Sequence, residues 1–144
     1  MTIPEGFRRL PIGGDFVELV GPLYLRHEGE LLLLGMRIEK RHTNPMGICH
    51  GGMLATFCDM LLPISIHRKS SVGMRFVPTI SLQLDYLAPA RLGNWLQGEA
   101  QILRVTKTMV FAQGLVSADD VPSVRVSGVF KIGPPIEHRP EIAG

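Results

Sequence analysis

A single carboxylate interrupts the most hydrophobic stretch of the chain. Asp59 is the only acidic or basic residue between His50 and His67, and the apolar positions around it recur at helical spacing. An isolated carboxylate among apolar neighbours is costly unless it has a partner. In a structural interpretation, Asp59 hydrogen-bonds a neighbouring turn or a Ser or Thr of a sheet. In a functional one, its surroundings poise Asp59 as a base or nucleophile.

Two glycines, Gly51 and Gly52, stand where this helix would begin. The first N–H groups of a helix have no intrahelical partner and lie at its positive end. Because glycine has no side chain, a ligand oxygen could approach these groups as closely as an oxyanion site requires. A tight turn is the plainer interpretation of the pair. The adjacent His50 could orient the loop or hold Asn44, and a structural role suits it at least as well as a catalytic one.

The spacing of these groups limits how they could work together. Gly51 and Asp59 are eight residues apart, which is about 12 Å along a helix that rises ~1.5 Å per residue. A reacting carbonyl needs its oxyanion donor within about 3 Å and its attacking group at about 3–3.5 Å. One copy of the helix cannot supply both. If both groups are catalytic, the site combines Gly51 of one subunit with Asp59 of another, as two antiparallel helices in a two-fold dimer would allow.

The elements that must position these residues can be predicted from the spacing of apolar side chains. Residues 51–67 predict a helix that is apolar nearly all round and therefore buried, with Pro63 expected to kink or shorten it. Residues 23–26 and 31–38 predict a hairpin. Four further strands follow from residue 79 onward and can form an antiparallel meander. Ile80 and Leu82 are expected on one face of the first of these strands, with Thr79 and Ser81 on the other. This order predicts an α+β fold.

Composition limits the class of protein. The 144 residues, 45% of them hydrophobic, suit one domain, 1–144, with residues 1–15 and 133–144 expected to be loose ends. The net charge is +2 and the basic residues are scattered, which argues against a nucleic-acid partner. The longest apolar run falls short of the ~20 residues of a membrane helix. Cys49 and Cys58, with no apolar leader of the secretory type, predict a cytoplasmic protein.

The spacing of Asn44, Gly47, His50, Gly51, Gly52 and Asp59 resembles that of hotdog-fold acyl-CoA thioesterases, specifically the PaaI-type branch linked to phenylacetate degradation. The later segment from Asp85 to Val116, with its aromatic-x-x-Pro-Ala turn, is also similar. The resemblance covers roughly residues 20–132. It implies a long central helix wrapped by a curved antiparallel sheet of five to six strands. It also implies a homodimer that often pairs into a tetramer, a dimer of dimers.

The resemblance also implies roles for particular residues. Asp59 would attack the thioester or activate the attacking water, the Gly51 N–H would polarise the carbonyl, and Asn44 would orient the water or the carbonyl. Alignment on the Pro-Ala turn gives Thr79 as the hydroxyl that positions the nucleophile, with Ser81, expected to point the same way, in reserve. The remaining expected substrate contacts are Gly52 and, for the phosphates of coenzyme A, Arg104 and Lys107. Coenzyme A is part of the substrate, so no cofactor and no metal is expected.

Two other functions stay open at this point. The chain could bind acyl-CoA without turnover, or it could be a hotdog hydratase acting on an enoyl-CoA. The hydratase chemistry uses a catalytic His, and in this sequence His50 lies beside the glycine pair instead. Aromatic, medium-chain and long-chain acyl groups are all compatible with the sequence.

Overall fold

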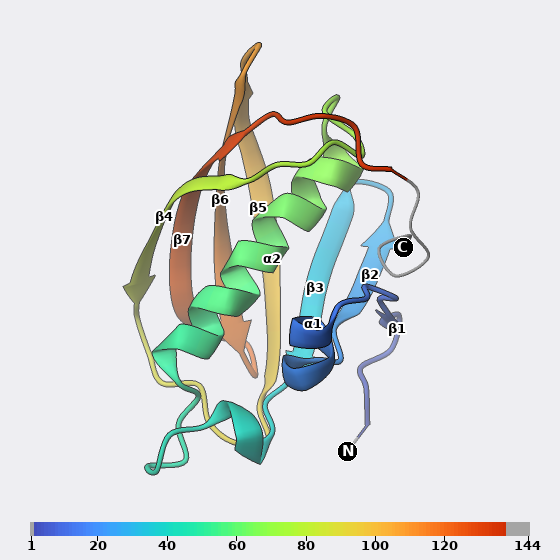
Figure 1. Cartoon of the computed structure of the whole chain (residues 1–144). Helices are drawn as coiled ribbons and strands as arrows, with labels where there is room; N and C mark the ends of the chain where they lie inside the picture. The colour runs from blue at the N-terminus through green and yellow to red at the C-terminus, as the bar shows by residue number, and fades with distance from the viewer. Residues whose placement is uncertain (1, 138–144) are drawn as a thin grey trace.

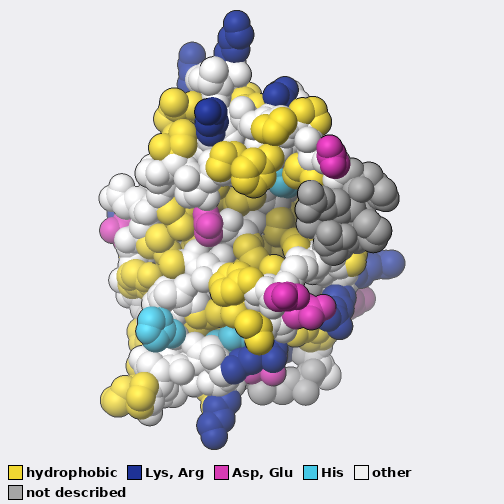
Figure 2. All heavy atoms as spheres, viewed as in Figure 1, with side chains coloured by type: hydrophobic (Ala, Val, Ile, Leu, Met, Phe, Trp, Pro, Cys, Tyr) yellow, Lys and Arg dark blue, Asp and Glu magenta, His cyan; other side chains and the backbone are white. Residues whose placement is uncertain are grey.

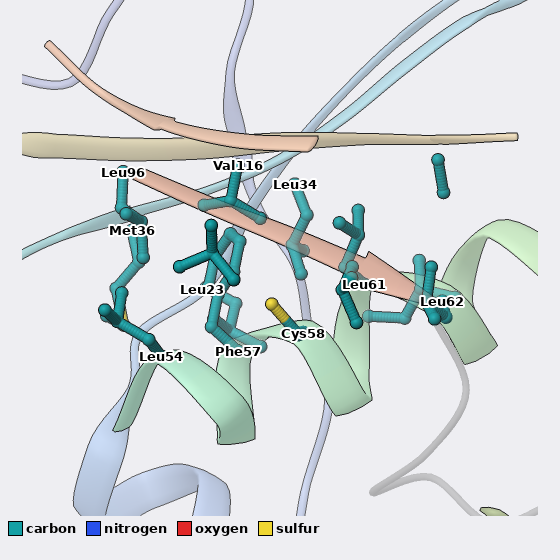
Figure 3. Close-up of a cluster of buried hydrophobic side chains, with 14 of the residues drawn as sticks. Leu23, Leu34, Met36, Leu54, Phe57, Cys58, Leu61, Leu62, Leu96 and Val116 are labelled. Carbon is teal, nitrogen blue, oxygen red and sulfur yellow. The ribbon is translucent and has the colours of Figure 1, made fainter. Parts of the chain in front are cut away.

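The longest run of helical spacing forms the longest helix, α2 (Gly51–Lys69). In the computed structural model, which describes residues 2–137, α2 lies across the concave face of a curved antiparallel sheet (Figure 1). Its buried side chains interleave with those of the strands and form the core (Figure 3). The expected α+β architecture is confirmed. No helix in residues 2–137 is long and apolar enough to cross a membrane.

The described residues form seven strands in the order β1-β2-β3-β5-β6-β7-β4, and all neighbours are antiparallel. The strands are β1 (Arg8–Arg9), β2 (Tyr24–Glu28), β3 (Leu31–Arg37), β4 (Thr79–Tyr86), β5 (Trp95–Val105), β6 (Met109–Ala118) and β7 (Val121–Lys131). A short helix, α1 (Asp15–Val20), and a 3-10 turn, η1 (Lys40–His42), precede α2. The hairpin expected at residues 23–26 and 31–38 is β2 and β3.

Strand β4 does not follow the order of the chain. A meander of the last four strands would place β4 beside β5, but β5 pairs with β3 on that side and β4 pairs with β7. The sheet therefore wraps around α2, and β4, which follows the helix in sequence, becomes its edge. The outer side of β4 has no partner strand within residues 2–137.

Three glycines on neighbouring strands allow α2 to pack close to the sheet. They are Gly98 in β5, Gly114 in β6 and Gly128 in β7. A Cβ at Gly98 would lie 2.7 Å from Leu61, and one at Gly128 would lie 2.9 Å from Leu62. Both distances are too short for real carbon contacts. The leucines of α2 therefore occupy the space that larger residues on the strands would fill.

Proline at position 63 does not end the helix. A helical proline removes the N–H that would bond the carbonyl four residues earlier, which here belongs to Asp59. Buried residues on both sides of Pro63, among them Leu62 and Ile64, anchor the helix in the core. The shortening expected from the sequence does not occur, and α2 continues to Lys69.

The N-terminal segment is more ordered than expected. Arg8 and Arg9 pair with β2, and Leu10 is buried in the core. The expectation that residues 1–15 form a loose end is therefore wrong for residues 8–10, and β1 raises the strand count to seven. At the other end, Gly133 and Ile136 donate backbone hydrogen bonds to the segment before β4. Residues 138–144, also expected to be loose, lie outside the described residues.

Replacing Gly98 with Val should lower the free energy of unfolding by about 1–3 kcal/mol, because the added side chain overpacks the seat of α2. Gln101→Val, at an exposed position of the same strand, should change stability by less than about 0.5 kcal/mol. Denaturant unfolding measures both variants. Equal stability of the two variants would contradict close packing of α2 against β5 at Gly98.

Candidate active site

The N-terminus of α2 leaves one backbone donor free. His50 is the N-cap, and its Nδ1 accepts a hydrogen bond from the Gly52 N–H at 2.9 Å. The His50 carbonyl accepts from the N–H groups of Met53, at 2.9 Å, and Leu54, at 3.1 Å. Within residues 2–137, the Gly51 N–H has no acceptor. It lies at the positive end of the helix, where a negatively charged oxygen is stabilised.

The bond between Gly52 and His50 defines what these two residues do. Because Nδ1 of His50 accepts this hydrogen bond, it carries no proton in this contact and the ring hydrogen lies on Nε2. His50 therefore has a structural role as a cap, one of the two roles considered from the sequence. The Gly52 N–H, expected from the sequence to contact the substrate, is bonded to His50 and is not a free donor. Of the glycine pair, the free donor belongs to Gly51.

A tight turn places Asn44 beside this helix terminus. Its side-chain oxygen accepts from the N–H groups of Met46, at 2.9 Å, and Ile48, at 3.2 Å. Gly47 has φ of 74° in this turn, a conformation that glycine adopts without strain. Because the Asn44 oxygen holds the loop, its amide N–H₂ is the end left to orient a water or a carbonyl.

His42 ties the same loop to the rest of the fold. Its Nε2 lies 2.6 Å from the Val20 carbonyl, and its Nδ1 accepts from the Glu39 N–H at 2.9 Å. Its own carbonyl accepts from the His50 N–H at 2.8 Å. Burial lowers the pKa of His42, which favours the neutral form that these contacts require. The cap residue is thus anchored through a buried, fully hydrogen-bonded imidazole.

Asp59 has the partner that the sequence suggested. The Thr79 hydroxyl donates to the Asp59 carboxylate at 2.7 Å. Asp59 lies on the partly exposed side of α2 in the single chain, so it is less buried than an all-apolar helix implied. The carboxylate is held at one oxygen and open to an incoming group.

A β-bulge aims Thr79 at the helix. Thr79 pairs with Phe130, which is fully buried on the core side, whereas Ser81 pairs with Val129 after a shift in register. Directly paired residues place their side chains on the same face. Thr79 therefore faces α2 and Ser81 faces away from it, so the expectation that the two hydroxyls point the same way is wrong. Ile80, expected on the same face as Leu82, is the bulged residue and is 53% exposed.

The C-terminal end of β4 contacts the N-terminus of α2. Tyr86 donates its hydroxyl to the Gly51 carbonyl at 2.8 Å. Tyr86 was not predicted as a site residue, although it is the aromatic residue of the motif before Pro89-Ala90. Thr79 and Tyr86 are seven residues apart on a strand, roughly 20 Å. Within one chain, β4 therefore holds Asp59 and Gly51 at separate ends.

The two cysteine thiols near the helix are poor candidates for a nucleophile. Burial, with a smaller contribution from the Asp59 charge, raises the pKa of Cys58 to about 12. Burial also raises the pKa of Cys49 to about 11. Both thiols are protonated at neutral pH, and a protonated thiol is a poor nucleophile.

The hairpin that carries the basic residues expected to contact coenzyme A lies far from the N-terminus of α2. Arg104 ends β5 and Lys107 lies in the turn to β6, and both are exposed. This hairpin projects from the end of the sheet opposite to the N-terminus of α2 (Figure 1). Figure 2 shows basic side chains at that end and hydrophobic ones over the face that carries α2. Within residues 2–137 no group of three or more His, Cys, Asp or Glu is placed to hold a metal ion.

A cavity of about 300 Å³ opens beside the helix terminus. Gly51 and Tyr86 border it, and its remaining lining is largely apolar: Ile48, Cys49, Leu54, Leu87, Ala88, Pro89 and Ala90. An apolar group attached to a carbonyl at the Gly51 N–H would find hydrophobic contacts there.

Comparison with known proteins identifies relatives over most of the chain. A family model described as the thioesterase superfamily matches residues 46–124. PA0474, an inferred esterase of Pseudomonas aeruginosa, is 30% identical over 133 residues, which are 92% of this chain and 98% of the relative. Mouse acyl-coenzyme A thioesterase 13 is 31% identical over 85 residues, 58% of each chain.

Solved structures share the fold at lower identity. Zebrafish thioesterase superfamily member 2 has a TM-score of 0.73 and 23% identity, covering 83% of this chain and 87% of its own. A mutant of the phenylacetic acid degradation protein PaaI of Thermus thermophilus has a TM-score of 0.69 and 18% identity, covering 83% and 99%. A hypothetical thioesterase of Streptococcus pneumoniae, solved with coenzyme A, has a TM-score of 0.67 and 14% identity, covering 74% and 83%. Together with the family match, these likenesses confirm the hotdog fold.

Exchanging His50 separates its cap role from any need for an imidazole. His50→Ala should lower the free energy of unfolding by about 1 kcal/mol, because the Gly52 N–H loses its acceptor. His50→Asn should remain within a few tenths of a kcal/mol of the wild type, because an Asn oxygen caps a helix well. Denaturant unfolding measures the difference. Similar losses in both variants would contradict the cap role.

Proposed function

Because the chain belongs to the thioesterase superfamily, we propose that it hydrolyses an acyl-CoA thioester to a free acid and coenzyme A. The names of the mouse and streptococcal relatives, and the coenzyme A in the latter's structure, support this class of substrate. The proposal rests on two groups that the same helix carries. α2 presents the Asp59 carboxylate, oriented by Thr79, and at its N-terminus the free N–H of Gly51.

The proposed chemistry assigns one role to each half of the site. The Gly51 N–H stabilises the negative charge that develops on the thioester oxygen. Asp59 either attacks the carbonyl carbon, forming an anhydride that water then hydrolyses, or removes a proton from a water that attacks directly. In both routes the C–S bond breaks, coenzyme A leaves as a thiolate and is protonated, and water supplies the new oxygen of the acid. Asn44 orients the water or the carbonyl, and Thr79 holds the carboxylate.

The two halves can meet in a two-fold dimer built on the free edge of β4. In an antiparallel pair of identical strands related by a two-fold axis, the start of each strand lies beside the end of the other. If Thr79 lies opposite Tyr86 of the partner subunit, the Thr79–Asp59 contact faces the partner's contact between Tyr86 and Gly51. Exposed apolar side chains along this edge, Ile80, Tyr86 and Leu87, support its being covered.

Other features of the proposal follow from the family resemblance. We expect the dimers to associate further into a dimer of dimers, Arg104 and Lys107 to contact phosphates of coenzyme A, and the protein to act in the cytoplasm. No cofactor and no metal takes part in the proposed reaction. A hydratase is less well supported, because its chemistry needs a free catalytic His and His50 serves as the N-cap.

A panel of acyl-CoA esters, with detection of the released thiol, tests the function. The wild type should hydrolyse at least one aromatic, medium-chain or long-chain ester. Asp59→Asn should lower kcat by about 10²-fold or more, because an amide is neither a base nor a nucleophile here. His50→Asn should keep activity, which it would not do if His50 were an acid–base catalyst. Water addition to an enoyl-CoA without thioester cleavage would support the hydratase instead, and binding without turnover would support a binding protein.

Mixed dimers test whether the site is shared between subunits. Gly51→Pro removes the N–H, and proline suits the first position of a helix. The extended conformation of His50, φ −59° and ψ 136°, is also one that a residue before proline adopts. Dimers of one Gly51→Pro and one Asp59→Asn subunit, purified through two affinity tags, should keep about half of the wild-type activity, since one of two sites is intact.

The parent homodimers provide the reference for this experiment. Each should keep only a small residual activity, because every site lacks one group. Gly51→Ala is the matched control, since it keeps the N–H and its Cβ lies 3.4 Å from the Tyr86 ring, an ordinary contact. A mixed dimer as inactive as its parents would mean that Gly51 and Asp59 act within one chain.

A further inference from the structure

The N–H that could bind the oxyanion belongs to Gly51, in a Gly-Gly pair whose backbone is intrinsically flexible. Gly51 and Gly52 are adjacent, and glycine has the widest range of backbone conformations of any residue. An oxyanion donor contributes fully only when it is already aimed at the position that the charged oxygen will occupy. Some contact must therefore restrict this backbone before the substrate arrives.

Two side-chain hydrogen bonds restrict one peptide group of this pair, one at its carbonyl and one at its N–H. The peptide that joins Gly51 to Gly52 has its carbonyl bonded by the Tyr86 hydroxyl, at 2.8 Å, and its N–H bonded to Nδ1 of His50, at 2.9 Å. The two side chains come from different elements, Tyr86 from β4 and His50 from the N-cap. Holding this peptide plane restricts the rotation of Gly51, whose own N–H is the free donor.

The properties of Tyr86 suit it to this contact. Burial raises the pKa of the Tyr86 phenol, so the hydroxyl keeps its proton and donates at neutral pH. The ring lies 3.4 Å from the position of a Cβ on Gly51, so it packs directly over the helix terminus. The same ring borders the cavity beside Gly51. Ring and hydroxyl could thus have separate effects, one on the cavity wall and one on the peptide.

We propose that Tyr86 is a positioning residue for the reaction, and that its hydroxyl holds the Gly51–Gly52 peptide so that the Gly51 N–H points at the thioester oxygen. This inference rests on the proposed thioester hydrolysis. It assigns the effect of the hydroxyl to the transition state, because charge on that oxygen is largest there. Loss of the hydroxyl therefore lowers kcat and leaves KM nearly unchanged.

Tyr86→Phe tests the role, because it removes the hydroxyl and keeps the ring. We expect kcat for the best ester of the panel to fall about tenfold, part of the 10²–10³ that loss of a whole oxyanion donor costs. KM should stay within about twofold, and the relative rates for short and long acyl chains should be unchanged. Tyr24→Phe, at the other tyrosine of the chain, is the matched control and should behave as the wild type.

A double variant distinguishes positioning of the donor from a general structural effect. In a Gly51→Pro background the donor is absent, so adding Tyr86→Phe should reduce the residual rate no further. Thermal unfolding of each variant verifies that the comparison is between folded proteins. A second readout is the amide NMR signal of Gly52, which should shift in Tyr86→Phe and not in Tyr24→Phe.

Three results would overturn the role of Tyr86 while leaving thioester hydrolysis intact. They are a wild-type kcat in Tyr86→Phe, a change confined to KM or to chain-length preference, and a loss that adds fully to that of Gly51→Pro. A wild type that hydrolyses no ester of the panel would overturn the proposed function and, with it, the role of Tyr86.

Discussion

The close packing of α2 into the curved sheet is the constraint on which the rest of the structure depends. Gly98, Gly114 and Gly128 bring the helix so near to the strands that its leucines occupy the missing side-chain positions. The sheet must then bend around the helix, which brings β4 to the edge beside it. From that edge, Thr79 and Tyr86 reach α2 at two different points. The contacts of the candidate site thus depend on how closely α2 packs against the sheet.

Hydrogen bonds at the start of α2 turn a general property of helices into a specific donor. Every helix begins with N–H groups that lack intrahelical partners. Here the side chain and carbonyl of His50 engage those of Gly52, Met53 and Leu54. The group that is left belongs to Gly51, which has no side chain to cover it. Two further polar residues hold the segment before the helix in place. The His42 carbonyl accepts from the His50 N–H, and the Asn44 side chain bonds its own turn.

Much of this could be predicted from the sequence because it depends on local spacing. Helical periodicity predicted α2, and an isolated acid within it predicted that Asp59 needs a polar partner. The separation of Gly51 and Asp59 along the helix follows from helix geometry alone, which is why the sequence predicts a site shared between subunits if both groups act on one carbonyl. The strand pairing was harder, because alternation in β4 does not tell whether β5 or β7 lies beside it. Pro63 was misleading, since burial on both sides keeps the helix intact.

The sequence by itself determined the helix, its one acid, its glycine start and the α+β class, because these depend on residues close together in the chain. Only the tertiary structure decided which hydroxyl meets Asp59. Strict alternation would turn Thr79 away from α2 together with Ser81, but the bulge against β7 aligns Thr79 with Phe130 and the core. The contact between Tyr86 and Gly51 likewise could not be predicted from the sequence. It depends, as the contact between Thr79 and Asp59 does, on the register between β4 and β7 and on the packing of α2 against the sheet.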